Sequence, residues 1–181
     1  MVTIFLFDLS IYLQHIVFHK VPFLWRIHRV HHSDINIDVT TGIRFHPLEI
    51  FISLFYKFFL IAIIGAPALA VIIFEILLNS SSMFNHSNIK INSKYEKFLR
   101  LFIVTPDMHH VHHSTCSIKS NKNFGFNLNI WDKIFGTYIK LSSDSVISIK
   151  KGVEIFRSKN DMRIDKLIYQ PLIKDKINIK E

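Results

Sequence analysis

The sequence predicts an all-α, integral-membrane helical bundle in which cytoplasmic helices carry clusters of histidine. Three observations predict it: 49% of the 181 residues are hydrophobic, long stretches are nearly free of charge, and 11 residues are histidine. Ordinary usage of roughly 2% would give about four histidines. With only 5 Gly, 5 Pro and 1 Cys, the composition argues against disorder, collagen, a repeat array, a disulfide framework and a cysteine zinc ribbon.

Residues 1–21 predict the first membrane-spanning helix, because they are apolar apart from one polar face. The polar residues are spaced i, i+4, i+7 and i+11, and therefore lie along one side of a helix: Asp8, Tyr12, His15 and His19. Ionisable groups at membrane depth face a bundle interior and are functional candidates. A secretory signal fits poorly, because the start lacks a basic region and no small-residue cleavage site follows.

Residues 48–78 predict a hairpin of two further helices. The stretch is longer than the ~20 residues that cross a hydrocarbon core once. Gly65 and Pro67 interrupt it near the middle, so we expect helices over 47–64 and 67–86, each able to cross or nearly cross the core. The alternative is one kinked core helix of a soluble protein, but nothing else in the chain is large enough to enclose it.

The distribution of Lys and Arg predicts the orientation. These residues gather between residues 20 and 46 and again after residue 87, whereas the turn between the hairpin helices has none. By the positive-inside rule, both basic regions lie on the cytoplasmic side. Orientation and anionic headgroups then explain the formal net charge of +8. We expect no nucleic-acid partner, because no zinc-finger, helix-turn-helix or RNA-binding signature is present.

Two regions follow the hairpin. Residues 89–104 mix basic and apolar side chains at helical spacing, which indicates either a helix on the membrane surface or an ordinary amphipathic helix packed on the domain. We divide the chain into a membrane domain over 1–140 and a polar cytoplasmic tail over 141–181, to which we assign no chemistry.

Most of the histidines fall into three clusters with helical spacing, namely His15-x-x-x-His19, His28-x-x-His31-His32 and His109-x-x-His112-His113. Pro22 and the run Thr105-Pro106-Asp107 are helix-start signals ahead of the second and third clusters. Offsets of three and four residues put the imidazoles of a cluster on one face, within the ~2 Å reach of a metal ion. One zinc ion takes three or four ligands, so two ions are the economical number.

The ligand type alone does not choose the metal, because imidazole binds iron, zinc, copper and nickel. No His is followed by Glu, so the zincin H-E-x-x-H motif is absent. Sensing of pH is another use of histidine, but it does not need the repeated spacing. The clusters lie at the cytoplasmic ends of membrane helices, where a lipid chain can reach a metal. Oxidation of an unactivated C–H bond needs a strong oxidant, which favours redox iron and O2.

In this order, the motifs resemble those of the fatty acid hydroxylase/sterol desaturase superfamily of integral-membrane, non-haem di-iron enzymes. The similarity covers about residues 5–140. Besides the three clusters it includes the following segments: Arg44-Phe45-His46-Pro47-Leu48-Glu49, Asn85-His86-Ser87-Asn88, Asn123-Phe124-Gly125 and Trp131-Asp132-x-x-Phe135-Gly136-Thr137.

The resemblance implies a lipid hydroxylase or desaturase of lipid biosynthesis, with two iron ions, O2 as co-substrate and an electron-donor protein of the cytochrome b5 or ferredoxin kind. It implies nine metal ligands, the last from the family's intermediate histidine position: His15, His19, His28, His31, His32, His109, His112, His113 and His86. We interpret His46 as a helix-start or headgroup contact. His110 is left out, because it points about 100° away from His109 on a helix.

Metal-bound histidines usually donate their other N–H to a carboxylate or carbonyl. The candidates for such supporting contacts are Asp8, Tyr12, Asp107 and Asp132. For Asp107, helix-start charge is an equally good explanation. We expect Trp25 and Arg26 to belong to the aromatic and basic collar at the membrane surface rather than to contact substrate.

Two other functions stay open. One is a zinc-dependent membrane hydrolase that acts on a lipid amide or ester through metal-bound water, although no glutamate base lies beside the clusters in the sequence. The other is an inactive metal-binding fragment. Members of the superfamily usually carry further hydrophobic helices ahead of the segment that holds Asp8, so the chain could be truncated, or it could complete its bundle as a homo-oligomer.

Overall fold

The computed structural model describes residues 1–174 of the chain. The described part is helical and contains no β-strand, only two isolated β-bridges. The α-helices are α1 Val2–Lys20, α2 Pro22–His32, α3 Pro47–Ile64, α4 Ala68–His86, α5 Ser93–Leu99, α6 Pro106–His112, α7 Ser117–Ser120, α8 Ile130–Ile134, α9 Ser143–Ile147 and α10 Ile164–Tyr169. The 3-10 helices are η1 Val39–Ile43, η2 Lys159–Met162 and η3 Gln170–Leu172.

Helices α1, α3 and α4 are each long and apolar enough to cross a membrane. At 1.5 Å per residue, each measures about 27–29 Å, close to the thickness of a hydrocarbon core. The predicted all-α fold with three candidate membrane-spanning helices is therefore confirmed for the described residues. The predicted hairpin bounds agree with the structure to one residue, because Gly65 and Pro67 lie in the turn.

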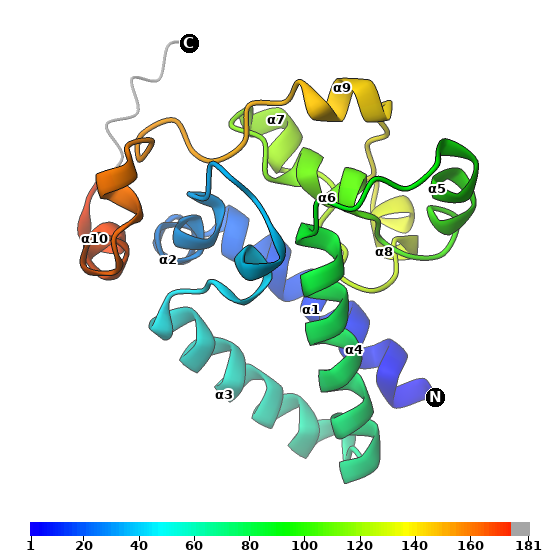
Figure 1. Ribbon diagram of the computed structural model, residues 1–181. Helices are drawn as coiled ribbons and strands as arrows, with labels where there is room; N and C mark the ends of the chain where they lie inside the picture. Colours follow the sequence, from blue (N-terminus) through cyan, green and yellow to red (C-terminus); the bar gives the residue numbers. More distant parts are fainter. Residues whose placement is uncertain (175–181) are drawn as a thin grey trace.

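In Figure 1, α3 and α4 form a V that is closed at the turn. Gly65 ends α3 in the left-handed conformation with φ 62°, which glycine adopts without a Cβ penalty. Near the closed end, α1 packs against α4 through Phe7, Ile11 and Phe74, and the rings of Phe7 and Phe74 lie 5.2 Å apart. This small apolar core fixes α1 against the hairpin.

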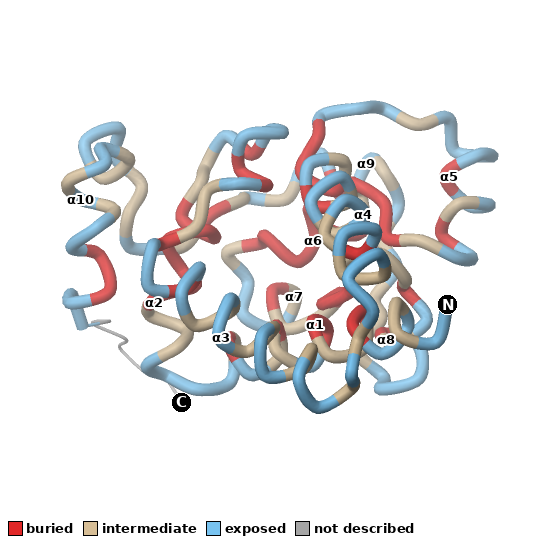
Figure 2. Tube along the Cα trace, turned by 90° about the horizontal axis from the view of Figure 1, so that it is seen from below, coloured by how far each residue is buried: buried red, intermediate tan, exposed pale blue. Residues whose placement is uncertain are grey.

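Helix α3 has few contacts with the rest of the described chain. Only 6% of its most apolar 18-residue window is buried, against 39% for α1, and Figure 2 draws nearly all of α3 as exposed or intermediate. Its exposed side chains are large and apolar, for example Phe51, Phe55 and Phe59. Such a surface is suited to lipid rather than to water.

The open end of the V holds the polar core. The last turn of α1, the last residue of α4 and the short helices α2 and α6 meet there (Figure 1). The buried residues of α2 and α6 include six histidines, which pack with their neighbours away from solvent: His28, His31, His32, His109, His110 and His112. A buried cluster of imidazoles is unusual for a helical core and marks this end of the molecule as the candidate site.

Beyond the hairpin, the structure is less regular than the predicted helix over 89–104. Only Ser93–Leu99 is α-helical. The buried Glu96 carboxylate binds Arg100 one turn later and accepts a hydrogen bond from the Thr105 hydroxyl at 2.8 Å. Thr105 therefore precedes α6 as predicted, but its hydroxyl contacts Glu96 instead of capping the helix.

The described part of the tail packs back onto the membrane domain. The buried Arg29 of α2 donates to the backbone carbonyls of Gln170 and Ile173, each at 2.5 Å. His46 caps α3 through Nδ1, which accepts from the Leu48 N–H, and its Nε2 lies 3.1 Å from the Ile168 carbonyl. The helix-start interpretation of His46 is therefore confirmed.

Candidate metal centre

The nine predicted ligands come together in two groups. In each group one nitrogen or oxygen atom per residue lies within 4.8 Å of all the others. The first group has five members: His15, His19, His28, His32 and His112. The second has four: His31, His86, His109 and His113. His32 of the first group stacks on His113 of the second, with ring centroids 4.2 Å apart, so the two groups are neighbours.

The four-histidine group has the dimensions of a tetrahedral metal site. His86 Nε2 lies 3.1, 3.0 and 3.1 Å from the Nε2 atoms of His31, His109 and His113, and the last two are 3.2 Å apart. Four nitrogens about 2.0 Å from one centre would be about 3.3 Å apart. One imidazole nitrogen cannot form hydrogen bonds to three others, since it has a single hydrogen or lone pair. A shared cation fits this arrangement better.

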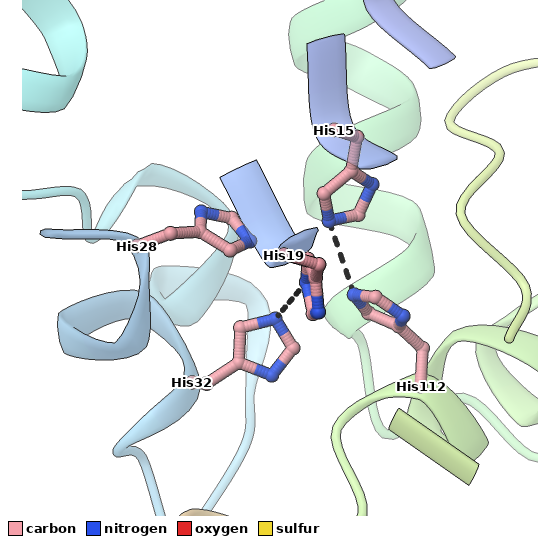
Figure 3. A group of neighbouring side chains, drawn as sticks. All are labelled: His15, His19, His28, His32 and His112. Carbon is pink, nitrogen blue, oxygen red and sulfur yellow. Dashed lines mark hydrogen bonds between the residues drawn. The ribbon is translucent and has the colours of Figure 1, made fainter. Parts of the chain in front are cut away.

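The five-histidine group is drawn from three separate helices, α1, α2 and α6 (Figure 3). His19 Nε2 lies 3.2 Å from His32 Nε2, and His15 Nε2 lies 3.1 Å from His112 Nε2. His28 Nε2 is buried and has no hydrogen-bond partner in the described structure. A buried nitrogen without a partner is costly, and a metal ion among these rings would satisfy it.

The outward nitrogens are held by carbonyls and one carboxylate. His15 and His112 approach the carbonyls of Phe124 and Lys122 through Nδ1, each at 2.8 Å. Such contacts fix Nδ1 as the protonated nitrogen and leave Nε2 free to bind a metal ion. His31 and His86 make the corresponding contacts with the carbonyls of Arg44 and Ser82, at 3.2 and 2.6 Å.

Burial keeps these imidazoles in the form that metals bind. Desolvation lowers the pKa of His31, His32, His109 and His113 well below 6.5. It lowers the pKa of His112 to about 3. A metal ion needs the neutral ring, because the proton and the metal compete for the same lone pair. The site is therefore ready to bind a cation at neutral pH.

The model of the fatty acid hydroxylase family matches residues 1–137, which include all nine histidines. The chain belongs to the fatty acid hydroxylase family. The resemblance inferred from the motifs is thus confirmed.

Curated proteins with lipid-related names share recognisable sequence with the chain. It is 28% identical to ornithine lipid hydroxylase from Rhizobium tropici over 72% of its length. It is 33% identical to human alkylglycerol monooxygenase over 82% and 27% identical to human cholesterol 25-hydroxylase over 73%. The chain spans 39%, 32% and 48% of the length of these three relatives. No solved structure matches it.

Among the predicted supporting residues, Asp132 reaches the five-histidine group through the backbone. Its carboxylate accepts from the N–H groups of Phe124 and Gly125 at 2.8 and 2.9 Å and from the Thr137 hydroxyl at 2.6 Å. It thereby holds the loop whose carbonyl, that of Phe124, approaches His15 Nδ1. An added Cβ on Gly125 would lie 3.0 Å from the Asp132 carboxylate, so the loop fits closely around it.

The other three candidates contact residues other than histidines in the described structure. The Tyr12 hydroxyl lies 2.7 Å from the Thr137 hydroxyl, which is itself bound to Asp132. Asp8 accepts from the Trp131 and Asn127 side chains at 2.7 and 2.8 Å. Asp107 accepts from the Ser143 hydroxyl at 2.6 Å. Tyr12 and Asp8 thus tie α1 to the segment around α8.

Two residues near the histidines have contacts that sequence reasoning did not assign to them. Glu49 Oε1 lies 2.6 Å from His28 Nδ1, and the other carboxylate oxygen is buried without a partner. Trp25, expected at the membrane collar, lies against His19 and His32 with ring centroids 4.9 and 5.3 Å apart. For Glu49 the available signal was an acid in the first turn of a helix that follows the second cluster.

Proposed function

We propose that the chain forms the metal-binding part of a membrane-bound lipid oxygenase, in which each histidine group holds one iron ion and O2 is the co-substrate. The observation that carries the proposal is the pair of adjacent, buried, all-histidine groups at one end of three apolar helices. The family membership supports it. When bound, the two iron ions would supply the reductive activation of O2 that oxidation of a lipid C–H bond requires.

The chain's own residues would hold and shield this centre. Carbonyls of Phe124, Lys122, Arg44 and Ser82 orient imidazoles from outside, and Glu49 does so for His28. Eight of the nine histidines are buried and His19 is partly buried, which keeps bulk water away from the centre. A cavity of about 310 Å³ between α1, α3 and α4 reaches His15 and His28, and most of its wall is apolar. A lipid chain could enter it from the bilayer.

Hydroxylation is favoured over desaturation, because the named relatives are two hydroxylases and a monooxygenase. Their names point to an ornithine lipid, an alkylglycerol and cholesterol, which have in common that they are lipids. We therefore propose a lipid substrate. Electrons would come from a separate protein of the cytochrome b5 or ferredoxin kind, and a homo-oligomer could complete the bundle.

We also propose that the centre faces the cytoplasm. The site lies at the end of α1, the start of α3 and the end of α4, so one membrane surface receives all three. Nearly all Lys and Arg lie at this end in the sequence, and the turn at residues 65–67 has none. The segment after residue 140 would lie on the same side as a polar tail that packs on α2.

Metal analysis of the purified chain tests the proposal. We expect about two iron ions per chain and oxygen uptake that needs a reductant and a lipid. His109→Ala should lower the iron content to about one, because it opens the four-histidine group. His110→Ala is the matched control, because this neighbouring buried ring contacts Lys151 and the backbone of His86 but belongs to neither group. One tightly held zinc ion without oxygen uptake would contradict the proposal.

A zinc-dependent lipid hydrolase is the second candidate, and one observation favours it. The unpartnered oxygen of Glu49 is a buried carboxylate oxygen beside the five-histidine group, and a hydrolase needs such a base next to metal-bound water. Turnover of an ester or amide lipid in the absence of O2 would support this function over oxygenation. Iron binding without any turnover would leave a metal-binding fragment.

A further inference from the structure

The cavity beside the histidines ends in two charged side chains, Lys57 and Glu75, which we call its floor. It lies between α1, α3 and α4. At one end it is lined by His15, His28 and Glu49, and at the other by Lys57 and Glu75. Apolar side chains make up most of the remaining wall. A cavity for a plain hydrocarbon chain would need no charged residue at this depth.

Helix α3 presents a line of polar groups to this cavity. Glu49, Ser53 and Lys57 are spaced by four residues and therefore lie on one helix face. The line is about 12 Å long from Glu49 to Lys57. Gln14 of α1 donates to the Ser53 hydroxyl at 3.1 Å, so the line has a polar neighbour across the cavity. The end of the cavity at Glu49, beside the histidines, and the end at Lys57 are thus held at a fixed distance by one helix.

The floor itself is an ion pair between α3 and α4. Lys57 Nζ donates to Glu75 Oε1 at 2.7 Å. Closer to the turn, Leu60, Ile61 and Ile64 pack on the apolar core. The ion pair therefore separates the closed, apolar end of the V from the open cavity above it. The two side chains are 21% and 35% exposed, and both line the cavity.

A purely structural role, in which the ion pair between Lys57 and Glu75 joins α3 to α4, does not explain why these two charged residues are present. The apolar contacts at the closed end already join α1, α3 and α4. Charged groups at membrane depth are expensive, and where they occur they usually mark a path for a substrate or ion. The described contact uses one ammonium hydrogen and one carboxylate oxygen, which leaves donors on Lys57 and lone pairs on Glu75 for a ligand.

A hydroxyl group matches such a floor. It can donate to the carboxylate and accept from the ammonium group at the same time. It also carries no charge, so its burial at membrane depth costs much less than that of a phosphate or free carboxylate. A methyl end of a hydrocarbon chain would leave both charged groups desolvated and without a new partner.

We propose that Lys57 and Glu75 bind an uncharged hydroxyl of the lipid substrate, about 12 Å along α3 from the end of the cavity where its reacting carbon lies. The substrate class is then an amphipathic lipid with a hydroxyl remote from the oxidised carbon. The assignment of a reacting carbon rests on the proposed oxygenase function, whereas hydroxyl binding at the floor does not.

Photolabelling tests the binding without any turnover. The full chain in phospholipid nanodiscs is irradiated with a decanol that carries a diazirine next to its hydroxyl, and the labelled residues are mapped by mass spectrometry. We expect labels at the floor, on residues such as Leu54, Lys57 and Asn79. A decane with the same diazirine should not label the floor selectively. Equal labelling by both probes, or decanol labels only around Ile43 and Glu49, would overturn the proposal.

Two double variants and one control separate recognition from a structural role. Lys57→Met/Glu75→Leu should weaken competition by unlabelled decanol roughly tenfold, the loss of a hydrogen bond to a charged group. Lys57→Glu/Glu75→Lys keeps an ion pair and should retain binding. Phe58→Leu, which is exposed on α3, should behave as the wild type. If the apolar variant lowers the melting temperature but leaves the preference for decanol intact, the pair is structural and the proposal fails.

The iron content of the same samples keeps the two proposals apart. If the samples contain no iron but the decanol probe still labels the floor, the oxygenase function is overturned and the hydroxyl site is not. Two iron ions without floor labelling would overturn only the hydroxyl site.

Discussion

At the scale of single residues, the geometry of the candidate centre depends on both ring nitrogens of each imidazole, one facing the group and one facing outward. The inner nitrogens converge within each group, and five outer nitrogens meet a carbonyl or a carboxylate. Glu49 is the one charged member of this outer set, and it is buried. Its distance of 2.6 Å to His28 Nδ1 makes it the strongest candidate for a positioning residue.

Replacement of Glu49 should weaken metal binding at the five-histidine group. We expect Glu49→Leu to lower the affinity for iron roughly 10- to 100-fold, because His28 loses the acceptor that orients its ring. Glu49→Gln should lower the affinity for iron less than Glu49→Leu does, since the amide oxygen of Gln can accept the same hydrogen bond from His28. Chelator competition measures the change, and Glu154→Leu at an exposed ion pair is the control. Unchanged affinity in Glu49→Leu would show that His28 needs no such support.

At the scale of elements, the centre is assembled from the ends of helices and one loop. Helix α1 contributes His15 and His19 from its last turns, and α4 contributes His86 as its last residue. The loop after α7 supplies the carbonyls of Lys122 and Phe124. The contact between Phe124 and His15 joins segments 109 residues apart in the sequence, so the candidate centre also links distant parts of the chain.

Asp132 should matter to the centre through this loop. The two carboxylate oxygens of Asp132 accept three hydrogen bonds. Asp132→Asn keeps only one accepting oxygen, so we expect the free energy of unfolding to fall by about 1–3 kcal/mol. Iron should also be lost from the five-histidine group. Asp107→Asn is the matched control, because the described hydrogen bond to Asp107 comes from Ser143 and not from a histidine of either group. The comparison uses thermal unfolding and iron content, and equal effects of both variants would contradict the prediction.

Labelling of Cys116, which lies just ahead of α7, can show on which side of the membrane the candidate site lies. This residue is the only cysteine in the chain and is exposed. We expect a membrane-impermeant maleimide to label it in inverted vesicles but not in intact cells, because the positive-inside rule puts this end in the cytoplasm. Cys116→Ser with Ala66→Cys should give the opposite pattern. Labelling of Cys116 from outside intact cells would refute the cytoplasmic orientation.

At the scale of the whole molecule, a polar, histidine-rich end is built on an apolar hairpin. Helix α3 buries little of its surface within the described chain, so lipid or further protein must cover it. The polar end in turn packs many neutral imidazoles side by side, away from solvent. Its stability should therefore depend on both metal and pH.

The metal-free protein should lose stability in acid. Burial lowers the pKa of His112 to about 3 and of His110 to about 4, from 6.5. Unfolding returns these rings to water, so between these values and 6.5 the unfolded state binds more protons than the folded state, and stability falls as the pH falls. Thermal unfolding of chelated protein in detergent, from roughly pH 8 to pH 4, checks this. A melting temperature that stays constant or rises in acid would contradict it.

Much of the fold could be predicted from local signals. The apolar runs with Gly65 and Pro67 between them predicted the hairpin, and Pro22 and Pro106 marked the starts of α2 and α6. The helical spacing of the histidines predicted three clusters that each share a helix face, and the resemblance added His86, but the structure divides the second and third clusters between the two groups. The helix over 89–104 was predicted too long, since Asn92 caps the start of the observed helix and Ile103 forms an isolated β-bridge with Leu128 beyond its end.

The three apolar helices and the three histidine clusters could be predicted from the amino-acid sequence, because they depend on composition and short-range spacing, and the resemblance of the motifs to a known family added His86. The division of the nine histidines into groups of five and four became clear only from the three-dimensional arrangement of the helices. That arrangement also decided that Glu49 supports His28, and that Lys57 meets Glu75 at the floor of a cavity. The physical reason is that these contacts join different helices, and the angles at which helices cross are set by packing across the whole molecule rather than by any local pattern.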